Sequence, residues 1–234
     1  MSIQDIDSRF YILTEANGKG VSLDTSVHEA VLELSKRYEK ADVDWTIHPD
    51  DGGMADKSNV AARNHYLRDS KSGVQNIFAA MLAAGRADFK HILDMPSGYG
   101  RLVRHLKVAF PKAEITVCDI VEDAVNFCAK QFGAIPVVSQ PELDLIKFND
   151  VKFDLIWSGS FFTHLPLHRF KQALQLFSHS LAPDGIAVIT VHGRFSSRYG
   201  SGAYLPSNRF NHAYQTYPSV GFGYADYEHG FSVN

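Results

Sequence analysis

The stretch HILDMPSGYG, residues 91–100, decides the fold of this chain. Its first residues predict a short buried strand that ends in a carboxylate, Asp94. A loop with Gly98 and Gly100 follows, and the apolar spacing predicts a helix from Arg101. Glycine has no Cβ and tolerates positive φ, so these two positions let the backbone come close to a ligand. A strand, a glycine loop and a helix in this order are typical of a nucleotide-cofactor cradle.

The glycine loop fits the dinucleotide fingerprint G-x-G-x-x-G poorly. The third glycine of that fingerprint would fall at Val103, and the residue two before Gly98 is Pro96. The loop fits D/E-x-G-x-G-x-G better, with Asp94 as the acid, Gly98 and Gly100 as the later glycines, and Pro96 in place of the first. Proline fixes φ and removes a donor, so it stiffens the loop and leaves the later glycines intact.

The composition is that of a single α/β domain with extra elements. The chain has 234 residues, 45% of them hydrophobic, and a formal net charge of −3. Without a long basic run, nucleic acid is not expected as a partner. No apolar run is long enough to span a bilayer, and the first residues lack the features of a signal peptide. Cys118 and Cys128 are not spaced as a metal or redox pair. We therefore expect two buried, reduced thiols and a cytoplasmic location.

Residues 1–88 are expected to form a helical N-terminal extension or cap. Ser26 and Glu29 make a capping box at the start of one helix. The polar, turn-rich stretch 42–58 predicts a loop, and a second helix is predicted after Gly73. Two interpretations stay open: the extension covers the active site, or it is a purely structural cap.

Strands and amphipathic helices alternate from residue 89 onward. This alternation predicts a doubly wound, mainly parallel Rossmann-like sheet with helices on both faces. Residues 89–234 would form this domain, and the sequence Pro-Asp-Gly at 183–185 predicts a turn before the fifth strand. The strands are expected at about 90–95, 114–119, 135–139, 153–157 and 186–191.

The joint order of these features resembles the class I S-adenosylmethionine (SAM)-dependent methyltransferases of the bacterial methyltransferase-domain type. The resemblance covers roughly residues 90–194. It is carried by DMPSGYGR at 94–101, by Asp119, by FDLIWSGSFFTHLP at 153–166 and by LAPDGIAVITVHGR at 181–194. It implies SAM as the cofactor and transfer of its methyl group by in-line displacement. These motifs are similar to those of enzymes of glycan or cell-surface biosynthesis, and this resemblance implies a small-molecule or glycan-type acceptor.

The C-terminal stretch departs from this family. The family is expected to add two strands after the fifth, as an antiparallel hairpin that closes one edge of the sheet. Residues 195–234 show little periodicity, and only 231–233 would open a further strand. We therefore expect this final hairpin to be missing and the C-terminal part of the domain to be incomplete.

The cofactor should bind at the carboxyl ends of the strands. Asp119 lies nineteen positions after Gly100, near the spacing at which an acid reaches the ribose hydroxyls. A helix N-cap is the alternative role for this residue. Ile120 would pack on adenine, Ser139 would meet its edge, and the small Ser158 would leave room for the sulfonium. The predicted cofactor-binding residues are Asp94, Pro96, Ser97, Gly98, Gly100, Asp119, Ile120, Ser139 and Ser158, and the resemblance adds Tyr66, in a segment that otherwise reads as a solvated loop.

Two histidines are candidate catalytic residues. His192 follows the fifth strand on the presumed substrate side, and His164 precedes a helix, where it could also be a buried imidazole bonded to a carbonyl. A base is needed only if the acceptor is a hydroxyl or a protonated amine. His164 and His168 are four apart, but Pro166 interrupts the turn and no third ligand is evident, so no metal is expected.

Three other functions compete with methyl transfer. A nucleotide-dependent oxidoreductase is disfavoured by Pro96 and Val103, and an aminopropyltransferase by the lack of acids at 158–161. A non-catalytic SAM-fold binding module stays open because of the C-terminal departure. The acceptor atom (O, N or C) and a homo-oligomeric state also stay open.

Overall fold

A computed structural model describes residues 25–52, 59–193, 211–226 and 231–233. Its centre is a five-stranded parallel sheet in the order β3-β2-β1-β4-β5. The strands are β1 (His91–Asp94), β2 (Glu114–Asp119), β3 (Ile135–Val138), β4 (Phe153–Ser158) and β5 (Leu181–Ile189). The helices around it are α2 (Thr25–Lys40), α3 (Val60–Ala84), α4 (Val103–Ala109), α5 (Glu122–Phe132) and α6 (Leu167–Ser180), with 3-10 turns η2 (Leu143–Leu145) and η3 (Phe162–His164).

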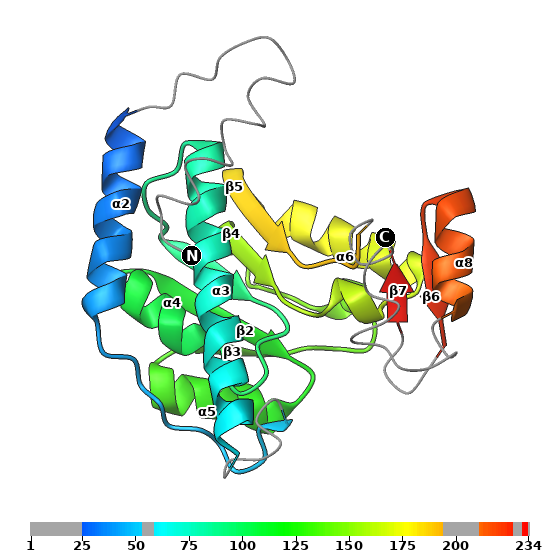
Figure 1. Cartoon of the computed structure of the whole chain (residues 1–234), viewed down its shortest axis with the longest axis horizontal. Helices are drawn as coiled ribbons and strands as arrows, with labels where there is room; N and C mark the ends of the chain where they lie inside the picture. Colours follow the sequence, from blue (N-terminus) through cyan, green and yellow to red (C-terminus); the bar gives the residue numbers. More distant parts are fainter. Residues whose placement is uncertain (1–24, 53–58, 194–210, 227–230, 234) are drawn as a thin grey trace.

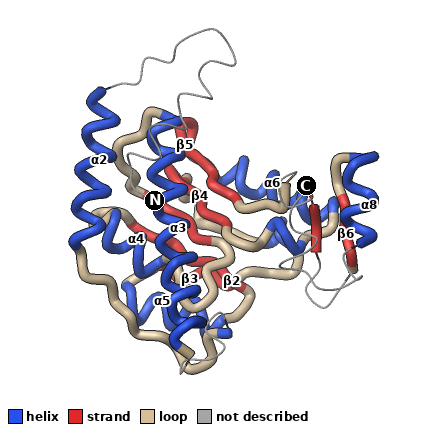
Figure 2. The backbone as a smooth tube through the Cα atoms, viewed as in Figure 1, coloured by secondary structure: helices blue, strands red, loops and turns tan. Residues whose placement is uncertain are grey.

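Helices cover both faces of the sheet, as Figures 1 and 2 show. Successive residues of a strand point to opposite faces, and each face has its own core. Ile92 of β1 packs in the core that α2, α3, α4 and α5 cover. Its neighbour Leu93 packs in the core that η2, η3 and α6 cover. The predicted fold class, a doubly wound Rossmann-like sheet, is therefore confirmed.

Helix α3 corrects the prediction for the N-terminal region. It begins at Val60 and not after Gly73, so Tyr66 lies inside a helix and not in a solvated loop. Asn59 caps its start by accepting from the N–H groups of Ala61 and Ala62. Gly73 fits within the helix because a Cβ there would lie 2.8 Å from Leu102 Cδ1, so close packing needs a glycine. The division of the chain at residues 88 and 89 stays a prediction.

The start of α2 also differs slightly from the prediction. The helix begins at Thr25, so Ser26 lies in its first turn and does not take the N-cap position of a capping box. Val31, Leu34 and Tyr38 of α2 are buried on its inner side. None of the described helices combines the length and the hydropathy that crossing a bilayer requires.

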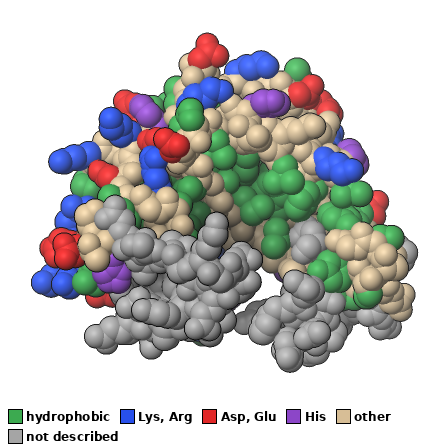
Figure 3. All heavy atoms as spheres, turned by 90° about the horizontal axis from the view of Figure 1, so that it is seen from above, with side chains coloured by type: hydrophobic (Ala, Val, Ile, Leu, Met, Phe, Trp, Pro, Cys, Tyr) green, Lys and Arg blue, Asp and Glu red, His purple; other side chains and the backbone are tan. Residues whose placement is uncertain are grey.

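The fifth strand is longer than predicted. Pro183, Asp184 and Gly185 lie within β5, where the register with β4 shifts between Phe153 and Leu155. The expected turn is thus an irregularity of the strand. Within the described ranges, β5 forms one edge of the main sheet, and its residues are half-buried or exposed. Hydrophobic side chains gather on the face of the molecule seen in Figure 3.

An antiparallel pair follows the parallel sheet. Strands β6 (Gly223–Ala225) and β7 (Phe231–Val233) form a separate two-stranded sheet beside helix α8 (Asn211–Val220). The strand expected at 231–233 is present, but among the described residues this pair does not extend the main sheet. Instead it contacts the turn after β4: the Ser232 hydroxyl donates to the Phe162 carbonyl at 2.7 Å.

Candidate active site

The glycine loop is held between two strands of the sheet. The Met95 N–H donates to the Trp157 carbonyl of β4 at 3.0 Å, and the Ser97 N–H donates to the Cys118 carbonyl of β2 at 3.1 Å. The Met95–Pro96 peptide bond between them is cis. The loop therefore lies at the carboxyl ends of β1, β2 and β4, where parallel sheets bind their ligands.

The two glycines of this loop face different surroundings. Gly98 has φ +49°, and no described atom lies within 4 Å of the place where a Cβ would stand. Gly100 has φ +77°, but a Cβ there would lie 2.6 Å from Phe132 Cε2 and 3.0 Å from Cys128 Sγ. Gly98 thus leaves its backbone open toward the outside of the loop, whereas Gly100 is required by internal packing.

Asp119 is placed beside Gly98 by two hydrogen bonds. Its Oδ2 accepts from the Gly98 N–H at 2.7 Å, and its Oδ1 accepts from the Val121 N–H at 3.0 Å. Val121 is the residue before helix α5, so the carboxylate supports the start of this helix without being its N-cap residue. A carboxylate oxygen has two lone pairs, so each oxygen can still accept from a ribose hydroxyl. Asp119 is 8% exposed, and the two hydrogen bonds fix the orientation of its carboxylate.

Asp94 and Ser158 carry buried polar atoms that are not satisfied. Both residues stand at the carboxyl ends of neighbouring strands, and both are nearly inaccessible. Asp94 Oδ2 and Ser158 Oγ have no hydrogen-bond partner among the described residues. Burial, and then the nearby Asp119, raise the pKa of Asp94 well above its usual range. An unsatisfied buried carboxyl is costly, so a cationic ligand placed beside it would be stabilised.

A cavity of about 280 Å³ opens next to the glycine loop. Four of the predicted cofactor residues line it, and most of the remaining lining is apolar. Such a mainly apolar space with an acid among its lining residues fits a nucleoside. The lining residues are Met95, Pro96, Cys118, Asp119, Ile120, Ser139, Gln140, Pro141, Leu143, Phe161, Leu165 and Arg169.

Tyr66 lies apart from this cavity, buried in α3. Its hydroxyl donates to Asp51 Oδ2 at 2.8 Å. The ring faces the guanidinium of Arg104, which is 1% exposed and donates to the Gly100 carbonyl at 3.1 Å. The same guanidinium donates to the carbonyls of Asp44 and Thr46 at 3.0 Å each. Arg104 thus ties the segment between α2 and α3 to the glycine loop.

The two candidate catalytic histidines lie near each other at the ends of β4 and β5. His192 Nδ1 donates to the Ser232 carbonyl at 3.0 Å, because a carbonyl can only accept. Burial lowers the pKa of His192, and the nearby His164 lowers it further. His164 is exposed in η3. The structure therefore joins the two histidines with the C-terminal strand β7, which the sequence did not connect to them.

One group among the described residues has the spacing of metal ligands. His48, Asp50 and Asp123 offer atoms within 4.8 Å of one another. The Asp50 N–H donates to His48 Nδ1 at 3.2 Å, so the neutral imidazole carries its proton on Nε2. That nitrogen faces Asp123 Oδ2 at 3.5 Å. The arrangement suits a hydrogen bond better than a metal ligand, which must present a lone pair.

Nothing in the sequence indicated that two arginines, Arg104 and Arg169, belong to the site. Arg104 falls on a predicted helix, where an arginine is normally solvated, and its burial depends on a segment some 60 residues earlier. Arg169 reaches the cavity from α6 and pairs with Glu142 of the connection between β3 and β4. The register of that connection could not be derived from the sequence, so this contact was not predictable.

Comparisons with known proteins agree with this geometry. A family model described as a methyltransferase domain matches residues 93–187. This stretch contains the end of β1, the glycine loop, Asp119 and β4. Residues 93–187 therefore resemble a methyltransferase domain, which agrees with the resemblance to SAM-dependent enzymes stated from the sequence.

Solved structures show a likeness of fold. The plantazolicin methyltransferase BpumL, in complex with a pentazolic desmethylPZN analog and S-adenosylhomocysteine (SAH), is 17% identical with a TM-score of 0.50. This match covers 86% of this chain and 80% of that one. A SAM-dependent methyltransferase from Clostridium acetobutylicum is 16% identical with a TM-score of 0.48. The chain spans 61% of that protein, with 61% of its own residues matched. A search among curated proteins gave no match.

The residues present fit SAM. The open backbone at Gly98, the cavity beside it and the unsatisfied carboxyl of Asp94 lie together at the ends of β1 and β2. SAM combines an adenosine, which suits a mainly apolar cavity with an acid on its rim, with cationic groups, which suit a buried carboxylate.

Proposed function

We propose that this protein moves a methyl group from SAM to a small-molecule or glycan-type acceptor by in-line displacement. The observation that carries this proposal is the open space beside Gly98, whose N–H donates to Asp119, at the strand ends that also carry the unsatisfied Asp94 carboxyl. Cofactor adenosine would occupy the cavity, with Ile120 on the base, Ser139 at its edge and Asp119 on the ribose.

The protein's part in such a reaction is alignment. When bound, SAM supplies an activated methyl group, so the chain need not activate the leaving group. Asp94 and the small Ser158 would hold the cationic end of the cofactor at the tips of β1 and β4. Pro96, Ser97, Gly98 and Gly100 would hold its middle through the loop backbone. Burial of these groups excludes water, which strengthens their interactions.

We infer that His192 accepts the proton of the acceptor group. Its Nδ1–H donates to Ser232, so the neutral ring has its lone pair on Nε2. Burial lowers the pKa of His192, which keeps this neutral form at physiological pH. A hydroxyl or an ammonium must lose a proton on methylation, and a neutral imidazole is suited to take it. His164 would orient the acceptor. Tyr66 would act at a distance, through Arg104 and the glycine loop.

The cytoplasmic location expected from the sequence belongs to this proposal. Cys118 and Cys128 are both free and buried, which agrees with a reducing compartment. Burial raises the pKa of each thiol to about 12, so both stay protonated. The thiols therefore support packing and not nucleophilic chemistry.

Two experiments test the proposal. Isothermal titration with SAM, SAH and NAD should show binding of SAM and SAH only. A protein that binds NAD and neither of the others would refute it. Incubation with methyl-labelled SAM and panels of sugars, nucleotide sugars and small hydroxyl or amine compounds should transfer label to one class. Binding of SAM without transfer to any acceptor or cell extract would favour the non-catalytic binding module.

A further inference from the structure

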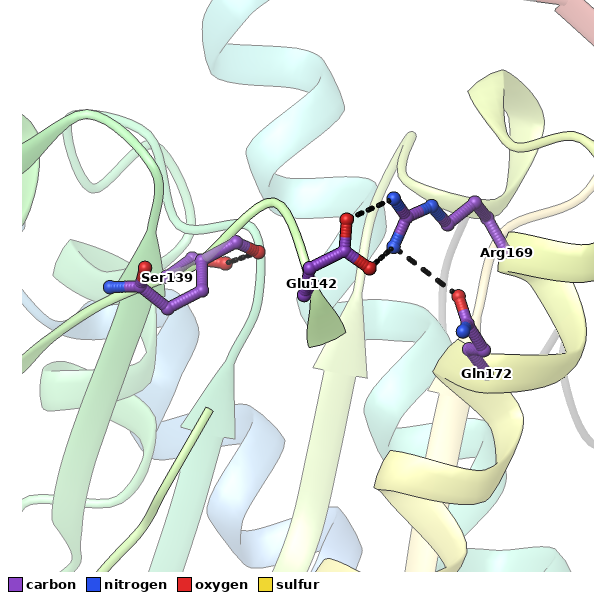
Figure 4. A network of polar contacts seen from close by, with 5 residues as sticks. Ser139, Glu142, Arg169 and Gln172 are labelled. Carbon is purple, nitrogen blue, oxygen red and sulfur yellow. Dashed lines mark hydrogen bonds and ion pairs between the residues drawn. The ribbon is translucent and has the colours of Figure 1, made fainter. Parts of the chain in front are cut away.

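A bidentate ion pair lies beside the cavity next to the glycine loop. Arg169 Nη2 donates to Glu142 Oε1 at 2.8 Å, and Arg169 Nη1 donates to Glu142 Oε2 at 2.9 Å. Nη1 also donates to Gln172 Oε1 at 3.3 Å. Figure 4 shows the three side chains pointing toward one another from two elements. A fork-to-fork pair with a third partner holds the guanidinium in one plane more firmly than a single surface contact would.

The two residues of this pair come from two different segments at the cavity. Arg169 comes from α6 and lines the cavity itself. Glu142 directly follows Ser139, Gln140 and Pro141, which also line the cavity. The pair therefore fixes the position of the guanidinium, and it also ties the segment 139–142 to the helix. This segment carries the atoms predicted to meet the edge of the base.

The chemistry of the pair suits a purine ring. Glu142 neutralises the charge of Arg169, so a flat guanidinium with reduced net charge borders a mainly apolar space. Such a group stacks on an aromatic ring and can donate to a ring nitrogen. A purine offers both a π-face and acceptor nitrogens. Lysine could not replace it, because an ammonium has neither the plane nor the fork.

We propose that Arg169 is a specificity-determining residue of the adenine subsite, and that Glu142 and Gln172 position it. This inference rests on the proposed function, since it assigns the cavity to the base of SAM. Arg169 contributes to binding equally before and during methyl transfer. Its loss therefore raises KM for SAM and leaves kcat unchanged.

The test compares Arg169→Met with a matched control, Arg86→Met. Both arginines have side chains that are 25% exposed and paired with a carboxylate, but Arg86 pairs with Asp154, away from the cavity. The ligands are SAH and adenosine, because adenosine contains the base without the amino-acid part. Arg169→Met should weaken both by about tenfold, the size of a partly desolvated stacking contact. Arg86→Met should leave both unchanged.

Two further variants distinguish the direct contact of Arg169 with the base from its positioning by Glu142. Arg169→Lys keeps the charge and should still lose most of the affinity, whereas Glu142→Gln keeps one acceptor and should lose less. Equal affinity for adenosine in Arg169→Met and Arg86→Met, with both variants folded by circular dichroism, would overturn the inference and leave the proposed function intact. A wild-type protein that binds neither SAH nor adenosine would refute the proposed function, and this inference with it.

Discussion

Gly98 and Gly100 stand two residues apart, both with positive φ, yet alanine at each should fail for a different reason. An L residue in this conformation costs about 1–2 kcal/mol. At Gly98 that strain is the only cost to the fold, because the space around the new methyl group is open among the described residues. At Gly100 the methyl group would also overlap Phe132 and Cys128, which adds about 1–3 kcal/mol for overpacking.

These magnitudes predict that Gly100→Ala is the more destabilising of the two variants, whereas Gly98→Ala is the one that directly blocks SAM binding. Gly98→Ala should lower the free energy of unfolding by about 1–2 kcal/mol, and Gly100→Ala by about 2–5 kcal/mol. In a chain of this size, each kcal/mol corresponds to a shift in Tm of about 2–4 °C. Gly98→Ala, in contrast, should weaken SAM binding by more than tenfold (about 1.4 kcal/mol), since the methyl group enters the space where the cofactor approaches.

Gly133→Ala is the control for backbone strain. Gly133 ends helix α5 with φ +62°, and the space around its missing Cβ is open to 4 Å among the described residues. It should therefore lose the same stability as Gly98→Ala and keep full SAM affinity. Thermal unfolding measures the first quantity and calorimetric titration the second. SAM binding by Gly98→Ala that equals that of Gly133→Ala would show that the cofactor does not approach this backbone.

Three further predictions follow from the site and the core. Asp119→Ala should weaken SAM binding by about 10–100-fold in titration, because ribose hydroxyls and the Gly98 N–H lose a charged acceptor; unchanged affinity would place the ribose elsewhere. The pKa of Asp94 is raised well above its ordinary value of 3.8 in the folded, ligand-free protein. As pH rises above 3.8, the unfolded chain releases this proton while the folded protein keeps it, so the free energy of unfolding falls. Asp94→Asn should therefore raise Tm at pH 8. It should also weaken SAM binding and remove most of the rise in SAM affinity with pH. A lower Tm at pH 8 would contradict this reasoning. Gly73→Ala should lower the free energy of unfolding by up to about 2 kcal/mol, because overpacking against Leu102 costs about 1–3 kcal/mol and the helix preference for alanine offsets about 1 kcal/mol of it. Gly52→Ala should not lower it, because the space there is open among the described residues.

The parallel sheet was predictable because its signals are local. Each buried strand is a short apolar run, and each helix between strands repeats its apolar residues at helical spacing. The strand tips follow from this pattern, so Asp94, Asp119 and Ser158 could be placed at one edge of the sheet. Cavity residues Ile120 and Ser139 followed for the same reason.

The missed features depend on contacts between distant segments. Gly73 looks like a helix breaker in the sequence, but Leu102 and Trp157 pack against it and stabilise one long helix. Asp184 and its neighbours look like a turn, but pairing with β4 draws them into β5. The burial of Arg104 likewise needs carbonyl groups from a segment that has no periodic pattern.

The bond from Ser232 to Phe162 has a consequence for synthesis on the ribosome. The five parallel strands are complete once Ile189 has emerged, and each of them pairs with at least one other strand of this sheet. The Ser232 hydroxyl, however, reaches Phe162 across 70 residues, and the Ser232 carbonyl fixes His192. Because domains form from the N-terminus during translation, the nucleoside half of the site can assemble early. The contact that holds His192 forms only with β7. If His192 is the base that we propose, a nascent chain would bind the nucleoside of the cofactor before it could transfer the methyl group.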